Sequence, residues 1–182
     1  MRAELGERRA RVRAGVAWAG NPRHPVRISY GGGQPGGHGE AIAWAMVKLA
    51  LEPVTCCANA RPDFLLNPDT GELLELDIWI AEHKLAVEFN GAQHYRPTTF
   101  ASEEEVAKQQ QRDAMKAALL EKNKIALAVL TAADLSVEAV RQKLEGLAPL
   151  RDLSLFQPLV SFLNRVGRNY QRKAQRLEAQ GA

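Results

Sequence analysis

Apolar and polar residues alternate in two neighbouring segments near the middle of the chain, and this period of two predicts a pair of β-strands. The segments are residues 73–80 (LLELDIWI) and 84–90 (KLAVEFN), and the short connection at 81–83 predicts a tight antiparallel hairpin. Because successive strand side chains point to opposite faces, Asp77 and Glu88 are expected on one face of the hairpin. Two like charges placed opposite each other destabilise a strand pair unless a cation lies between them.

Helical spacing of apolar residues predicts helices on both sides of this hairpin. These helices are expected at residues 3–18, 40–51, 102–122, 136–147 and 157–178. Further strands are expected at residues 53–58, 62–66 and 124–130. Ser102 and Glu105, three residues apart, have the spacing of a capping box and predict the start of the third helix.

This order of elements predicts an α/β fold in which a small mixed β-sheet, with the antiparallel hairpin at its centre, is flanked by helices. A length of 182 residues suits one domain with appendages. Residues 39–148 are expected to form the core, preceded at 1–38 by a basic helix and a glycine-rich loop and followed at 149–182 by a basic helical tail. The loop GGGQPGG lacks the Lys-Ser/Thr of a phosphate-binding P-loop, so it is interpreted as a linker, with a mobile loop near the substrate as the alternative.

Charge is unevenly distributed along the chain, although the net charge is only +3. Residues 1–36 carry seven basic and two acidic side chains, residues 37–140 nine basic and sixteen acidic, and residues 141–182 eight basic and three acidic. Basic ends can neutralise phosphates while an acidic centre collects carboxylates for a cation. Solvated helix faces and an acidic middle that arises by chance are the alternative.

Two further features bound the cellular setting. Cys56 and Cys57 are adjacent, so an ordinary disulfide between them is excluded, and they lack the CxxC spacing of a zinc site. Buried or half-buried strand thiols are expected. The sequence has no apolar run long enough to span a membrane, and charged residues occupy the N-terminus where a signal peptide is apolar. We therefore expect a cytoplasmic protein without a membrane partner.

The polar residues around the hairpin are those that phosphodiester hydrolysis requires. Asp77 and Glu88 can supply the oxygen ligands that Mg²⁺ or Mn²⁺ prefers. His94, just beyond the second strand, can transfer a proton near neutral pH. On the following helix, Gln110 and Asp113 are three residues apart on one face, with Lys116 at its margin.

Three segments carry a resemblance to a known family. The resemblance is to the PD-(D/E)XK nuclease superfamily, and it rests on residues 76–95 (LDIWIAEHKLAVEFNGAQHY), residues 110–116 (QQRDAMK) and the apolar strand at 124–130. The nearest branch contains very-short-patch-repair-like enzymes, phage nucleases and related homing endonucleases. That branch has a Glu on an early helix, an Asp on a strand, an E-x-(D/N)-G-x-Q-H segment and a Q-x-x-D-x-x-K helix. The matching positions here are Glu40, Asp77, Glu88, Gln93, His94, Gln110, Asp113 and Lys116.

The resemblance implies a restriction-endonuclease-like core and a role for each matched residue. Asp77 would be the main metal ligand, with Glu88 beside it and Glu40 orienting or sharing the metal. His94 would accept or donate the proton during hydrolysis. The remaining catalytic or substrate-binding positions would be Gln93, Gln110, Asp113 and Lys116. Taken alone, Glu40 could equally be a first-turn acid, and Asp113 with Lys116 a solvated helix face.

Two departures from the family pattern qualify this assignment. Asn90 stands where the superfamily name has Lys, so water activation would depend on the metal or on His94. The cysteines of the zinc ribbon found in many phage relatives are absent, so substrate recognition would depend on the basic ends, including Arg165, Arg168 and Arg172.

The sequence therefore predicts a Mg²⁺- or Mn²⁺-dependent endonuclease that hydrolyses DNA, of the phage or mobile-element type. The alternative is a nucleic-acid-binding protein that keeps the nuclease fold without the reaction. RNA is a second candidate substrate, because the core chemistry does not distinguish the sugars. Whether one copy or a homodimer acts on a duplex is left open by the sequence.

Overall fold

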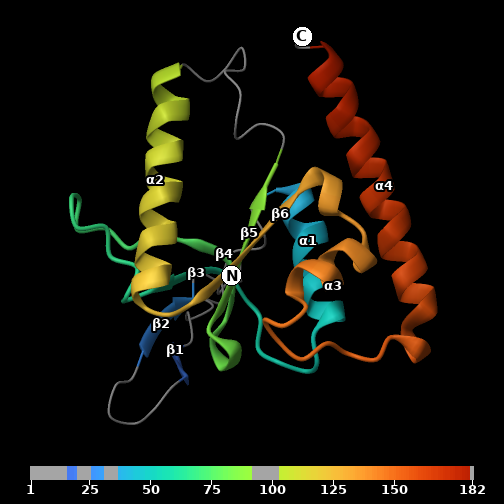
Figure 1. The fold of residues 1–182 in the computed structure, drawn as a ribbon, viewed down its shortest axis with the longest axis horizontal. Coiled ribbons are helices and arrows are strands. Elements are labelled where there is room, and N and C mark those ends of the chain that lie inside the picture. The colour runs from blue at the N-terminus through green and yellow to red at the C-terminus, as the bar shows by residue number, and fades with distance from the viewer. Residues whose placement is uncertain (1–15, 20–25, 31–36, 92–102, 181–182) are drawn as a thin grey trace, which may run out of the picture.

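The computed structural model describes residues 16–19, 26–30, 37–91 and 103–180, which form a mixed α/β fold built on one six-stranded sheet (Figure 1). The strands are β1 (Val16–Ala19), β2 (Val26–Tyr30), β3 (Cys57–Pro62), β4 (Leu76–Ile80), β5 (Leu85–Asn90) and β6 (Ala126–Thr131). The longer helices are α1 (His38–Ala50), α2 (Glu103–Lys122), α3 (Val137–Leu144) and α4 (Gln157–Gln180). None of the helices in these ranges is both long and apolar enough to cross a membrane.

The strands lie in the sheet in their chain order, β1 to β6. Neighbours from β1 to β5 are antiparallel, whereas β5 and β6 are parallel. A parallel pair requires a crossover connection, and α2 lies within this one. The sheet is therefore mixed, as predicted, and the crossover brings α2 onto the face of the sheet beside β4 and β5.

The predicted hairpin is formed by β4 and β5. A short 3-10 turn, Ala81–His83, joins them, and Lys84 adopts a left-handed conformation with φ 48° while its N–H donates to the carbonyl of Ala81. Ile78 lies opposite Val87 in the antiparallel register. The register fixes the face of every side chain on the two strands, because a slip of one residue would reverse them all.

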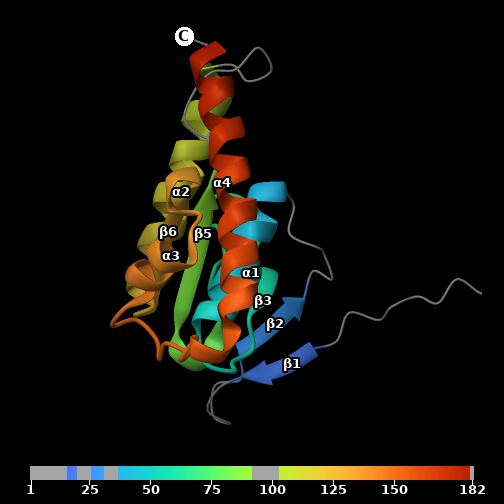
Figure 2. The ribbon, with the colours of Figure 1, turned by 90° about the vertical axis from the view of Figure 1, so that its right-hand side faces the viewer.

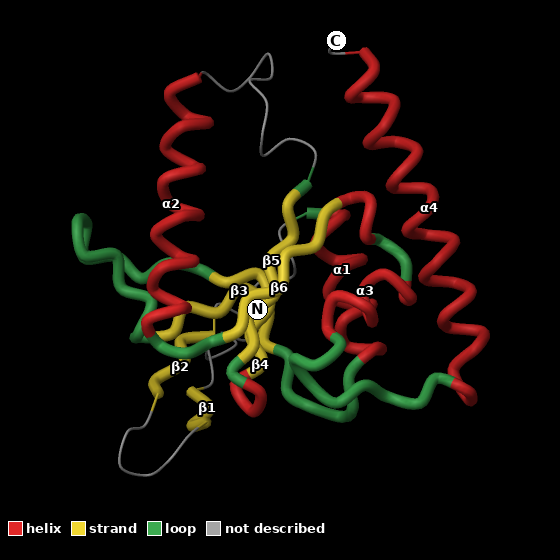
Figure 3. Tube along the Cα trace, viewed as in Figure 1, coloured by secondary structure: helices red, strands yellow, loops and turns green. Residues whose placement is uncertain are grey.

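Apolar cores lie on both faces of the sheet. Figures 1 and 2 show the helices that flank it. On one face, α1, α3 and α4 pack over a cluster that includes Ile78, Val87 and Phe89. On the other face, Leu120 of α2 packs in a cluster with Trp79. The tube in Figure 3 shows the strands between these two groups of helices. Polar side chains on β4 and β5 are therefore set within a largely apolar environment.

The C-terminal helix α4 is closely packed against the core. The ideal Cβ of an alanine at Gly167 would lie 2.0 Å from the carbonyl oxygen of Leu135, so only glycine permits this approach. The Asn164 side chain accepts a hydrogen bond from the N–H of Val137 at 2.8 Å. Leu163 is buried in the same cluster as the α1 residues. The basic tail predicted for residues 149–182 thus contributes apolar residues to the main core.

The predicted helices at 40–51, 102–122 and 157–178 and the strand at 124–130 are confirmed as α1, α2, α4 and β6, with small differences at their ends. The helix predicted at 136–147 is confirmed but ends at Leu144, and Gly146 follows with φ 75°. Ser136 caps α3 by accepting from the N–H of Ala139 at 3.2 Å. Cys57 is buried and Cys56 half-buried, as expected.

Two predictions of secondary structure are wrong. The helix predicted at 3–18 overlaps β1, because residues 16–18 pair with β2, and Val16 and Trp18 belong to residue types that favour strands. The rest of that helix, the glycine-rich loop at 31–36 and Ser102 lie outside the described residues. The two strands predicted at 53–58 and 62–66 are replaced by β3, which is held by pairing with β2 on one side and β4 on the other.

Candidate active site

Asp77 and Glu88 interlock across the β4–β5 hairpin. The N–H of Asp77 donates to Oε1 of Glu88 at 3.3 Å, and the N–H of Phe89 donates to Oδ2 of Asp77 at 2.8 Å. Each carboxylate thus accepts a hydrogen bond from the backbone of the opposite strand. The predicted juxtaposition of these two acids is observed, and both strands fix it.

The helix α2 supplies a lysine to this pair. Lys116 donates from Nζ to Oε2 of Glu88, and the two side chains are only 14% and 12% exposed, respectively. One turn earlier on α2, Asp113 accepts a hydrogen bond from Nε2 of Gln109 at 2.9 Å. Asp77, Glu88, Asp113 and Lys116 therefore converge from two strands and one helix, as the sequence predicted.

The environment of Glu88 favours its neutral form. Burial raises the pKa of Glu88 from the ordinary 4.5 to about 7, and the negative charge of Asp77 adds to the rise. The ammonium group of Lys116 opposes it. Because Glu88 lies between a like charge and an opposite one, a second cation near both carboxylates would favour the charged form further.

A cleft of about 740 Å³ opens beside this cluster, between α2 and the β3–β4 side of the sheet. It is lined by Arg61, Glu72, Leu73, Leu74, Glu75, Asp77, Gln109, Arg112, Asp113 and Lys116. A second cavity of about 220 Å³ adjoins it and includes Glu88 and Asn90 in its lining. Asp113 and Lys116 line both cavities, so they stand at the boundary between them.

Gln109, rather than the predicted Gln110, takes part in the site. Gln110 is exposed and is not in the lining of either cavity, whereas Gln109 contacts Asp113 and lines the cleft. Residues four apart on a helix lie 40° apart around the axis, and residues three apart lie 60° apart. The family motif has its glutamine three residues before the aspartate, which gave Gln110. The rotation of α2 on the sheet instead brings Gln109, four residues before Asp113, to the cleft.

Two arginines of the cleft were not predicted. Arg61 on β3 forms an ion pair with Glu75 at 3.0 Å, and Arg112 of α2 is exposed beside it in the lining. Arg112 precedes Lys116 by four residues and therefore lies on the same face of the helix, which was a usable signal once Lys116 was a candidate. Arg61 carried no such signal, because its place beside the cleft depends on the β3–β4 register.

Several predicted site residues line neither cavity. Glu40 is in the first turn of α1, the helix that packs with α3 and α4 on the opposite face of the sheet from α2. Its Oε1 is buried, and the preceding residue, Gly39, packs against the ring of Phe89 on β5. The arginines at 165, 168 and 172 are exposed on α4, on that same opposite side. His94 and Gln93 lie outside the described residues, so the structure does not place them.

The two carboxylates of the hairpin fit a hard divalent cation in their chemistry. Mg²⁺ is commonly held by one or two carboxylates, with water and substrate phosphate completing its shell. Among the described residues, no group of three or more His, Cys, Asp and Glu side chains is arranged to hold a metal ion. A site built on Asp77 and Glu88 would therefore take its remaining ligands from other oxygen atoms, such as those of water and substrate phosphate.

Comparison with known proteins gives relatives but no family. No family model matches the chain, and no solved structure matches it. Uncharacterized protein 033L of Invertebrate iridescent virus 3 is 32% identical over 109 residues, which are 59% of this chain and 55% of that protein. Uncharacterized protein 307L of Invertebrate iridescent virus 6 is 41% identical over 76 residues, 38% of this chain and 39% of that protein.

A third relative, uncharacterized protein 094L of Frog virus 3 (isolate Goorha), is 38% identical over 61 residues, 32% of this chain and 39% of that protein. The chain thus spans about half or less of the length of these relatives. Their names record a viral source and no activity.

Proposed function

We propose that this chain is a divalent-metal-dependent endonuclease that hydrolyses phosphodiester bonds of DNA, with a restriction-endonuclease-like core. The observation that carries the proposal is the convergence of Asp77 and Glu88 with Lys116 at the edge of an open cleft. The order of hairpin, crossover helix and parallel strand supports the proposed core. The resemblance of residues 76–95 and 110–116 to the PD-(D/E)XK superfamily supports it as well.

The proposed role of each side chain follows from its place. Asp77 and Glu88 would hold the cation, which when bound polarises a phosphate and lowers the pKa of a coordinated water. Lys116, next to Glu88, is positioned to neutralise negative charge that develops on the phosphate. Gln109 holds Asp113 in place on the same wall of the cleft.

The arginines of the cleft would bind the nucleic acid backbone. Guanidinium groups match phosphate oxygens with two parallel hydrogen bonds, which favours Arg61 and Arg112 for this role. Proton transfer, either activation of the attacking water or protonation of the leaving oxygen, is proposed for His94.

The decisive experiment is a plasmid-nicking assay on the full chain with Mg²⁺ or Mn²⁺. We expect wild-type protein to convert supercoiled plasmid to nicked or linear product, and Asp77→Asn to lower the rate by at least about 100-fold, because substitutions beside a metal site already cost 10–100-fold. Binding of plasmid by Asp77→Asn should persist, since the arginines remain.

Glu72→Gln is the matched control, because it removes a carboxylate from the lining of the same cleft without touching the hairpin. It should cut at close to the wild-type rate, and both variants should show the circular dichroism spectrum of the parent. Equal cutting by Asp77→Asn and wild type would refute the assignment of the site.

One observation favours a second candidate, a non-catalytic nucleic-acid-binding protein with the same fold. Glu88 already has a cationic partner in Lys116, so charge compensation inside the protein reduces its need for a metal. Binding of DNA by wild-type protein without cleavage in Mg²⁺, Mn²⁺, Co²⁺ or Zn²⁺ would support this candidate.

A further inference from the structure

The basic face of α4 forms a surface separate from the cleft. We define the α4 stripe as Arg165, Arg168, Arg172 and Arg176. We propose that the α4 stripe is a second nucleic-acid-binding surface, which holds the phosphate backbone of duplex DNA without regard to sequence. The inference takes its ligand class from the proposed function, but it requires no catalysis.

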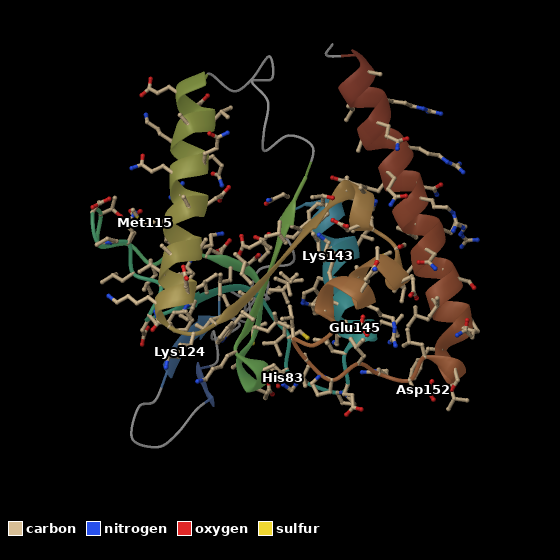
Figure 4. All side chains as sticks on the ribbon, in the orientation of Figure 1. His83, Met115, Lys124, Lys143, Glu145 and Asp152 are labelled. Carbon is tan, nitrogen blue, oxygen red and sulfur yellow. The ribbon has the colours of Figure 1, made fainter. Side chains whose placement is uncertain are left out.

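Helix geometry aligns the four arginines. Their spacings of three, four and four residues keep them within about 80° around the axis and along about 16 Å of its length. All four are exposed. Leu163, Gly167 and Ala174 are buried on the opposite side of the same helix. The stripe is therefore one continuous face that points away from the protein core, and Figure 4 shows the nitrogen-tipped side chains of α4 extending outward.

The helix holds the stripe in a fixed position. The close approach at Gly167 and the hydrogen bond between Asn164 and Val137 fix the middle of α4. Nearer the C-terminus, Gln171 donates from Nε2 to the carbonyl of Ala133 at 3.0 Å. Side chains on a rigid element lose less conformational entropy when they bind a ligand than side chains on a loop.

The charge of the stripe is available to a ligand. In the described part of the chain, no carboxylate forms an ion pair with any of its four arginines. Arg165 lies over the ring of Phe162 at 5.5 Å, a contact that leaves its guanidinium charge in place. Arginines clustered along one helix are the electrostatic footprint of a nucleic-acid-binding surface.

Duplex DNA fits this face better than an anionic membrane does. A membrane-bound amphipathic helix needs an apolar face to insert between lipids. On α4, Leu163 and Ala174 are buried, whereas the apolar side chains of Leu159, Phe162 and Leu177 are exposed. Phe162 and Leu177 lie about 22 Å apart along the helix, so the exposed apolar side chains do not form one continuous apolar face. The four arginines do form a continuous row, which complements a row of backbone phosphates.

The stripe and the cleft lie on opposite sides of the molecule, because α4 and α2 cover opposite faces of the sheet (Figures 1 and 2). A straight duplex that enters the cleft would not lie along the stripe. The stripe would hold a different segment of the same DNA, or a second duplex.

The test is fluorescence anisotropy with a labelled duplex, EDTA and a series of salt concentrations, on the full chain. Arg168→Gln/Arg172→Gln/Arg176→Gln should weaken binding by at least about tenfold at low salt and reduce the slope of log K against log salt by about 2–3. The matched control is Lys84→Asn/Lys122→Gln/Lys124→Asn, which removes three exposed lysines outside the stripe and the cleft. It should keep the wild-type slope.

Equal losses in the two triple variants would overturn the inference, because they would report net charge alone. Unchanged DNA binding by the stripe variant would also overturn it, as would stripe-dependent binding of phosphatidylserine vesicles with no stripe-dependent binding of DNA. The nicking assay separates this result from the proposed function. If the stripe variant loses affinity while Asp77→Asn cuts like wild type, the stripe stands and the proposed active site fails.

Discussion

Glu88 is buried on β5 between an acidic neighbour, Asp77, and a basic one, Lys116. Its raised pKa shows that the folded protein holds this carboxyl in an environment that disfavours its charge. An unfolded chain ionises the same group at its ordinary pKa. The difference makes the stability of the metal-free protein depend on pH.

We expect Glu88→Gln to become progressively more stable relative to wild type as pH rises from about 4.5 to about 7, in EDTA. In that range wild-type Glu88 remains protonated in the folded state and ionised in the unfolded state, so stability is lost with rising pH. The difference in the free energy of unfolding should approach the order of 3 kcal/mol above pH 7, since one pKa unit corresponds to about 1.4 kcal/mol.

Urea denaturation of both proteins between pH 4 and 8 measures this difference. Curves of unfolding free energy that stay parallel across the range would contradict the raised pKa. Added Mg²⁺ should narrow the gap at pH 7.5 if the carboxylates hold the ion, because binding to the folded state stabilises it.

The pairing of Asp77 with Glu88 could be predicted from the sequence, because period-two alternation and a short connection fix the register of a hairpin. The role of Gln109 could not be predicted from the sequence. Residues 109 and 110 both lie close to the direction of Asp113 on a helical wheel. Which of them faces the cleft depends on how α2 rotates to bury Leu120, and that rotation is a property of the whole fold.

At the level of elements, prediction succeeded where a segment carries its own pattern. Residues 40–51 and 124–130 have apolar residues at the spacing of one element type, and both form that element. Prediction failed for β3, because its sequence, CANARP, does not alternate apolar and polar residues as a strand does, and its Asn59 has φ 50°. Pairing with β2 and β4 holds β3 in the sheet, so long-range contacts override local preference.

The close approach of α4 to Leu135 gives a prediction at this scale. Gly167→Ala should lower the free energy of unfolding by about 1–3 kcal/mol, because overpacking against a backbone carbonyl forces one element to move. The loss should occur although alanine favours a helix over glycine by up to about 1 kcal/mol. Thermal unfolding monitored by circular dichroism measures it.

Asn169→Ala is the control, because Asn169 is exposed on the same helix and its replacement tests helix propensity without a clash. It should leave stability within about 0.5 kcal/mol of wild type or raise it. A Gly167→Ala variant as stable as this control would show that α4 lies farther from Leu135 than described.

At the scale of the whole molecule, the sheet separates the two surfaces that are proposed to bind nucleic acid, the cleft beneath α2 and the α4 stripe. The sequence showed basic ends around an acidic centre, but it could not show that the C-terminal arginines face away from the candidate site. That arrangement arises because the apolar side of α4 packs on α1 and α3. The net charge of a segment does not show which face of the folded molecule its charged side chains occupy.

Two surfaces that face apart predict that one protein molecule can bridge two duplexes. Short duplexes labelled separately with a donor and an acceptor dye should show energy transfer when protein is added in EDTA, and excess protein should abolish the transfer. The stripe variant should lose it, and so should a variant of the cleft, Arg61→Gln/Arg112→Gln. Energy transfer that requires a dimer in analytical ultracentrifugation would contradict bridging by a monomer.

Glu88 lies on a hairpin with apolar clusters on both faces, and its contacts with the N–H of Asp77 and with Lys116 require an acceptor oxygen at this position. Directed evolution for heat resistance alone would therefore be expected to replace Glu88 with glutamine, which keeps an acceptor oxygen without the cost of burying a charge. A carboxyl group that lowers the stability of the folded protein indicates a role other than folding.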